Sequence, residues 1–259
     1  SVVITQLMFY LFPAMIISLS LHFPSKYCMY PIHWNIQTKK IITGGVTLLS
    51  FLLLVILSLS WYSDKQFARG YHLPRACYKP QAYQALSSAI AFNPTEPIFH
   101  DEQGAILSML ALAAWKENQI TMSQELTTLS IKENDTALSI SPNNVNFWKS
   151  RTKIFYALSP INPSYLKEAI KALEKGLTLS PLDPKLYYNL AILYGQIGLT
   201  DKSMELMKKS IELKPNYREG YYGLFLLYKE AGMPEAQQII NEYLTKVDPT
   251  DKEFQELIH

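Results

Sequence analysis

The chain has 259 residues, of which 48% are hydrophobic, and its 24 Lys and Arg nearly balance its 22 Asp and Glu. The charges are unevenly placed, because residues 1–63 hold only Lys26, Lys39 and Lys40, whereas every acidic residue lies from Asp64 onward. The part from Asp64 is close to neutral, so its net charge gives no electrostatic case for nucleic-acid binding, which would need a basic face.

Residues 1–22 form an uncharged, apolar segment, and we expect a transmembrane helix there, kinked at Pro13. A signal peptide would need an initiator Met, a basic first region and a clear cleavage site, and the segment has none of these. Because the chain opens within an apolar run, we expect it to be the C-terminal part of a longer membrane protein. Residues 23–40, which carry the three lysines, are interpreted as a basic connecting loop.

Residues 41–62 are predicted to form a second transmembrane helix. Ile41–Ser60 is a run of 20 uncharged residues, and at about 1.5 Å per residue it is long enough to cross a hydrocarbon core of roughly 30 Å. Trp61 and Tyr62 follow it, as is typical of a membrane interface. Equal numbers of basic residues flank its two ends, so the positive-inside rule favours neither orientation.

Residues 63–250 contain a repeated pattern marked by prolines. Pro181, Pro215 and Pro249 are 34 residues apart, and Pro142 and Pro94 continue the series with longer gaps. This period and these prolines resemble the tetratricopeptide repeat (TPR) family, in which each repeat is a pair of helices. The resemblance implies an all-α fold, in which one or two transmembrane helices precede an α-solenoid of about five helix pairs. Residues 251–259 are interpreted as a C-terminal tail.

Small residues recur where the two helices of each predicted pair would cross: Ala82 and Ala89, Ser130 and Ala137, Ala169 and Gly176, Ser203 and Ser210. Gly198 and Gly232 stand where the chain should turn between helices, a place that favours positive φ. The second repeat is 14 residues longer than 34, and the segment 116–124 is interpreted as an extended turn. The prolines at 160 and 163 are expected to lengthen the turn in the third repeat.

The resemblance also implies a concave groove, since positions 2, 5, 9 and 12–13 of each repeat face a ligand in the family. Arg151 stands where the family has a large apolar residue, so it is either a packing irregularity exposed to solvent or a ligand contact. Tyr188 and Tyr222 are either groove residues or rings packed between repeats. The candidate partner-binding residues are Asn146, Lys149, Arg151, Lys153, Lys185, Tyr188, Ile192, Gln196, Glu219, Tyr222, Leu226 and Glu230.

The residue types of this groove suit a polar peptide or a sugar chain. No catalytic, cofactor-binding or metal-binding residues are predicted, because the five histidines share no ligand spacing and no nucleophile motif occurs. Asp101 and Glu102 are consecutive on a predicted helix and are interpreted as part of a solvated face. Asn134, in a formal glycosylation sequon, also falls in a predicted helix.

Membrane segments followed by repeats resemble the C-terminal part of bacterial O-antigen ligase/polymerase-type membrane proteins. The resemblance lies in "NNVNFWKSRTKIFYALSPINPSYLKEAIKAL", "SPLDPKLYYNLAILYGQIG" and "LKPNYREGYYGLFLLYKEAGMPEA". It implies an extracytoplasmic docking domain of a glycan-assembly protein that binds a protein or a glycan. The alternative is a stand-alone membrane-anchored adaptor that binds proteins and has no enzymatic role.

Overall fold

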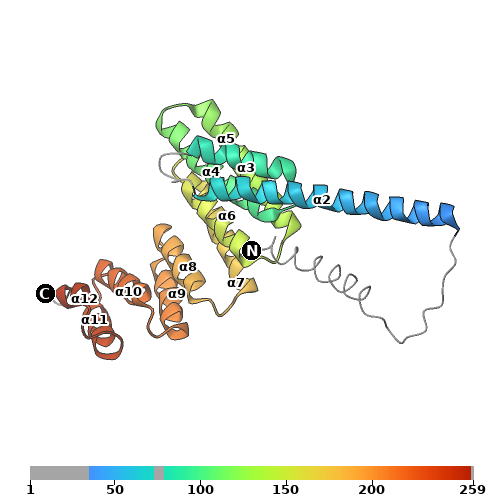
Figure 1. The fold of residues 1–259 in the computed structure, drawn as a ribbon. Coiled ribbons are helices and arrows are strands. Elements are labelled where there is room, and N and C mark those ends of the chain that lie inside the picture. The colour runs from blue at the N-terminus through green and yellow to red at the C-terminus, as the bar shows by residue number, and fades with distance from the viewer. Residues whose placement is uncertain (1–34, 73–78, 258–259) are drawn as a thin grey trace, which may run out of the picture. The chain divides into compact units, whose positions relative to one another are not determined.

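The computed structural model describes residues 35–72 and 79–257, and every element in these ranges is a helix (Figure 1). The first transmembrane helix predicted from the sequence, at 1–22, lies outside the described residues. Two compact units are present, residues 1–65 and residues 66–259. The helices are α2 (Ile36–His72), α3 (Lys79–Phe92), α4 (Pro97–Lys116), α5 (Ile120–Ile140), α6 (Val145–Leu158), α7 (Ser164–Leu179), α8 (Pro184–Gln196), α9 (Thr200–Leu213), α10 (Arg218–Glu230), α11 (Glu235–Lys246) and α12 (Lys252–Glu256).

Helix α2 contains the apolar segment that the sequence places in a membrane. It has 37 residues and is the one described helix long and apolar enough to cross a bilayer. Large apolar side chains along it, such as Leu48, Phe51 and Leu54, are exposed. Its last turns belong to the second unit, where Phe67 packs against Ala82 of α3 and stacks on Phe99 of α4.

The second unit is built from helix pairs, in which α4 packs on α5, α6 on α7, α8 on α9 and α10 on α11 (Figure 1). Each pair also packs on the next along the chain. All eight small residues expected at the helix crossings are buried, which confirms the close approach inferred from the repeats. Gly104 shows how close it is, since a Cβ added there would lie 2.9 Å from the carbonyl oxygen of Ser130.

The turns between paired helices use positive φ, as expected. Gly198 (φ 81°) lies between α8 and α9, and Gly232 (φ 67°) lies between α10 and α11. The longer turn predicted around residues 160–163 is also present, because α6 ends at Leu158 and α7 begins at Ser164.

The extended turn predicted at residues 116–124 is wrong. Only residues 117–119 separate α4 from α5, with Asn118 at positive φ (61°). The extra residues lie in the helices instead: α4 has 20 residues against 13 in α8, and α5 has 21 against 14 in α9. Seven extra residues make about two turns of helix, so the buried face of each long helix stays in phase with that of the shorter ones.

The carbonyl groups of the recurrent prolines accept hydrogen bonds from side chains six residues further along the chain. At four boundaries, a side chain in the first turn of a new helix donates a hydrogen bond to the carbonyl oxygen of the proline, a group left without a helical partner. The bonds are His100 Nε2 to Pro94 (2.9 Å), Trp148 Nε1 to Pro142 (2.8 Å), Tyr187 Oη to Pro181 (3.0 Å) and Gln255 Nε2 to Pro249 (2.7 Å).

The segment interpreted as a C-terminal tail contains α12, which packs on α11. Phe254 is fully buried and lies 4.0 Å from Tyr243, measured between ring centroids. Arg218 of α10 donates hydrogen bonds to both carboxylate oxygens of Asp251, at 2.7 and 3.2 Å. The helix therefore covers the core that α10 and α11 would otherwise leave open at the end of the stack.

Candidate functional site

The candidate site is a groove along α6, α8 and α10, the first helices of three successive pairs. It consists of two hollows that share Ile192. The lysine hollow, of about 440 Å³, is lined chiefly by Lys149, Lys153, Tyr156, Lys185, Asn189 and Ile192. The tyrosine hollow, of about 540 Å³, is lined chiefly by Tyr188, Ile192, Gln196, Tyr222, Leu226 and Glu230.

Positive charge is in excess in the lysine hollow. Lys149 Nζ donates a hydrogen bond to Asp183 Oδ2 at 2.6 Å, whereas Lys153 and Lys185 have no ion-pair partner among the described residues. Burial alone would raise the pKa of Asp183, but hydrogen bonds from Lys149 and from the backbone of Lys185 lower it below its ordinary value. Asp183 is thus ionised and holds Lys149 in place, while the other two ammonium groups are available to an anion.

The tyrosine hollow combines aromatic rings with exposed aliphatic side chains. Tyr188 is half-buried, and its ring forms a T-shaped pair with that of Tyr217. Burial is the main cause that raises the pKa of Tyr188, and the negative charge of Glu219 adds to it. Ile192 and Leu226 are 37% and 44% exposed, which is high for aliphatic residues lining a hollow. A ligand covering this surface would remove apolar area from water, which favours binding at roughly 25 cal/mol per Å².

The two tyrosines line the groove and also pack within the repeats, and whether they contact a ligand stays a prediction. Tyr222 lines the tyrosine hollow and also lies 6.1 Å from Phe254 between ring centroids. Tyr188 lines the same hollow and packs on the core of the last repeats. Each ring therefore packs in part against other repeat residues and in part lines the groove.

Three of the predicted residues, Asn146, Arg151 and Glu219, line neither hollow. Arg151 faces α5, where its Nη1 donates to Asn134 Oδ1 at 3.0 Å and to Asp135 Oδ1 at 2.5 Å. Its guanidinium also lies 5.1 Å from the centre of the Phe155 ring. Arg151, which stands at a repeat position where the family has an apolar residue, is thus paired with Asp135 of the neighbouring helix.

Tyr156 and Asn189 are among the lining residues that the sequence-based set lacks. Tyr156 lines the lysine hollow and accepts a hydrogen bond from Gln196 Nε2 at 3.0 Å, which links two successive repeats. Tyr156 stands at the twelfth repeat position, which faces the groove in the family, so its position could have identified it. Asn189 follows Tyr188 directly, and it lines the lysine hollow together with residues of α6.

The prediction that Asp101 belongs to a solvated face is wrong. Asp101 is only 8% exposed, and its Oδ1 accepts a hydrogen bond from Asn134 Nδ2 at 2.9 Å. Burial raises its pKa to about 6, although hydrogen bonds from Ser150 and Asn134 partly oppose the shift. The long helix α5 covers this carboxylate, and Asn134 on α5 is itself buried, so the sequon is closed to modification.

The described ranges contain no group of three or more His, Cys, Asp or Glu side chains positioned to hold a metal ion. His100 contacts Glu133 Oε2 through Nδ1 at 2.6 Å, and its other nitrogen is bonded to Pro94. What the groove offers is a binding surface with a basic part and an apolar, aromatic part.

The helix pairs and their spacing are those of a tetratricopeptide-repeat-like α-solenoid fold. Residues 184–217, which cover α8 and α9, match the family described as "Tetratricopeptide repeat". No curated protein matches the chain by sequence.

Several solved structures are similar in fold. PilF of Pseudomonas aeruginosa aligns with a TM-score of 0.54 at 18% identity, covering 73% of this chain and 78% of its own. MamA aligns at 0.51 and 19% identity, covering 74% and 91%, respectively. A thermophilic TPR protein from Thermus thermophilus aligns at 0.50 and 17% identity, covering 76% and 96%. At these identities the likeness is one of fold.

Proposed function

We propose that the protein is a membrane-anchored docking domain whose groove binds an acidic, partly apolar peptide segment of a partner protein. The observation that carries this proposal is the division of the groove, with unpaired ammonium groups in the lysine hollow and exposed aliphatic side chains in the adjoining tyrosine hollow. Carboxylates suit the first part and apolar side chains suit the second.

A peptide fits the groove better than a sugar chain. Sugars bind tyrosine by stacking on an open ring face, but the Tyr188 ring is half-buried, because it packs on the core of the last repeats and lies 5.5 Å from Tyr217 between ring centroids. A peptide needs only the ring edges, the aliphatic side chains and polar groups such as Asn189 and Gln196 for its backbone. A glycan in the groove is retained as an outcome of the test.

Selection from a random peptide library on the full-length chain in detergent tests this proposal. Bound peptides should be enriched in Asp and Glu next to apolar residues, and Lys153→Gln with Lys185→Gln should abolish the acidic enrichment. Lys167→Gln, on the exposed surface of α7, is the matched control and should leave the selection unchanged. Enrichment of basic peptides, or binding of glycans but no peptide, would refute the assignment.

The anchor in this proposal is the apolar part of α2, which is supported by its length, its composition and its exposed side chains. With the anchor inserted, the second unit lies on one side of the bilayer, and we propose the extracytoplasmic side. A cysteine in place of Lys208, which is exposed on α9, should react with an impermeant reagent in intact cells once Cys28 and Cys77 are replaced by serine. Protection until lysis would place the repeats in the cytoplasm.

The finer proposal is that this docking domain forms part of an O-antigen ligase/polymerase-type protein of the cell envelope. Its support is the order of apolar segments and repeats, together with the three sequence stretches quoted above. A gene that encodes about ten further apolar segments upstream of Ser1 would agree with it, because such enzymes cross the bilayer many times. A start codon directly before Ser1 would instead favour the stand-alone adaptor.

A further inference from the structure

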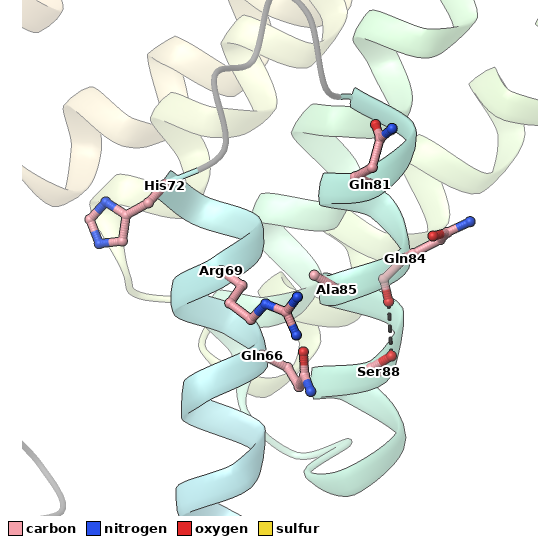
Figure 2. A pocket seen from close by; sticks show the side chains of 7 residues that line it. All are labelled: Gln66, Arg69, His72, Gln81, Gln84, Ala85 and Ser88. Carbon is pink, nitrogen blue, oxygen red and sulfur yellow. Dashed lines mark hydrogen bonds between the residues drawn. The ribbon is translucent and has the colours of Figure 1, made fainter.

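Another hollow lies away from the groove, between the last turns of α2 and helix α3. It has a volume of about 630 Å³, and all of its lining residues belong to the second unit. Among the described residues, the lining is polar and carries no carboxylate; these residues are Gln66, Arg69, His72, Gln81, Gln84, Ala85 and Ser88. Figure 2 shows Gln66 and Arg69 extending from α2 into the space between the two helices, with Ala85 facing them from α3.

Gln66 is the observation that points to a ligand. It is only 8% exposed and lines the hollow, yet its side-chain amide makes no hydrogen bond with any other described residue. Neither atom of this amide is among the fully buried side-chain atoms that lack a partner, so the amide is open to the hollow, where a ligand or water can bond to it. Ser88 is different, because its hydroxyl donates to the Gln84 carbonyl at 2.9 Å, the bond dashed in Figure 2.

Arg69 gives the hollow its charge. Its guanidinium has no carboxylate partner in the part of the chain that the structure describes, and Figure 2 places it beside the Gln66 amide. A guanidinium and an amide donor side by side suit a phosphate group, which accepts several hydrogen bonds and carries negative charge.

The position of the hollow along α2 indicates where such a phosphate would come from. Gln66 and Arg69 follow Tyr62, at the end of the apolar segment, by four and seven residues, or about 6 and 10 Å along a helix. The polar headgroup layer is roughly 5–7 Å deep on each side of a bilayer. With α2 inserted, the two side chains lie at the outer edge of that layer.

We propose that this hollow binds a phosphate group, and that its source is the headgroup of an anionic phospholipid next to α2. The choice of lipid rests on the membrane anchor proposed above, whereas the phosphate chemistry does not. The bound headgroup would hold the last turns of α2 and helix α3 at the membrane surface.

Native mass spectrometry of the full-length chain in detergent tests this proposal, by counting retained molecules of phosphatidylglycerol and of phosphatidylcholine. The wild type should retain phosphatidylglycerol preferentially. Arg69→Gln should weaken this retention about tenfold, as the loss of a charged hydrogen-bonding group commonly does. Gln84→Ala, at the exposed rim, should have a smaller effect, and Lys167→Gln, which removes one charge elsewhere, should have none.

A second arm adds inorganic phosphate or glycerol phosphate to the same samples. If either displaces the lipid and raises the melting temperature of the wild type but not of Arg69→Gln, the phosphate site stands and the lipid source is refuted. Equal lipid retention in all variants would show that the hollow is only a solvated polar surface, and it would overturn the proposal. These measurements are made in detergent, so they do not depend on the proposed membrane anchor. The anchor is tested separately, and extraction of the chain from membranes by carbonate would refute it.

Discussion

Replacing Asp101 by asparagine should stabilise the protein near neutral pH. The carboxylate is buried between α4 and the long helix α5, where loss of hydration favours its protonated form and raises its pKa from 3.8 to about 6. Asparagine has the same shape and keeps an oxygen that can accept the hydrogen bond from Asn134. The variant therefore removes a buried charge without creating a cavity.

The sign and size of the effect follow from the pKa shift. The folded state binds this proton more tightly than the unfolded chain does, so the group costs nothing below pH 3.8 and its full penalty is reached above about pH 6. A shift from 3.8 to about 6 corresponds to about 3 kcal/mol, taken as an order of magnitude. The free energy of unfolding of Asp101→Asn relative to wild type should thus rise with pH across this interval and then level off.

Urea unfolding of the full-length chain in detergent, followed by circular dichroism at several pH values, measures this difference. Asp201→Asn, which removes an exposed carboxylate at the start of α9, controls for the change in net charge. A difference between Asp101→Asn and wild type that does not change with pH would refute the reasoning. So would a variant that becomes less stable than wild type as the pH rises, because the hydrogen bonds would then outweigh the burial.

Two further predictions concern the repeats themselves. Gly198→Ala should lower the free energy of unfolding by about 1 kcal/mol in urea titrations, because an alanine at φ 81° is strained; an unchanged midpoint would contradict the turn geometry. Phe254→Ala should remove about 3 kcal/mol or more from the C-terminal end, because the ring is fully buried. Amide exchange should then speed up in α10–α12 and not in α4–α7, since each repeat couples chiefly to its neighbours, and a uniform increase would contradict this.

The features predicted correctly from the sequence depend on local chemistry. The proline spacing, the small residues at the helix crossings and the two glycines at the turns each reflect a short-range requirement of one helix pair. At Ser203, for example, the paired helix comes so close that the Ser203 hydroxyl donates a hydrogen bond to the Ala191 carbonyl oxygen at 2.7 Å, which leaves room only for a small side chain. Such requirements recur in every repeat, so one sequence already contains several copies of the same signal.

The failures arose where a repeat departs from its neighbours. The polar segment after Lys116 was interpreted as a turn, but it continues into α5 because the chain reverses in three residues at Asn118. The extra turns of α5 then bury Asp101, which its sequence neighbourhood places on a polar face. Nothing within the repeat pattern indicates that a carboxylate will be covered by a helix more than thirty residues away.

The groove shows the same division. Nine of the twelve candidate residues line one of the two hollows. They stand at repeat positions that the resemblance to the TPR family implies for a groove, and whether they bind a partner stays a prediction. Arg151 lines neither hollow, because its charge is drawn to Asp135 on the neighbouring helix. Which lysines are paired and which are open to a ligand is set by contacts between repeats.

By itself, the sequence determined that this protein is a stack of paired helices preceded by an apolar segment, because helix period, turn geometry and hydropathy are properties of neighbouring residues. Only the tertiary structure decided the length of the second pair, the burial of Asp101, the partition of the groove into two hollows and the unpartnered amide of Gln66. The physical reason is that burial and ion pairing depend on which surfaces meet, and those surfaces belong to helices that are distant along the chain.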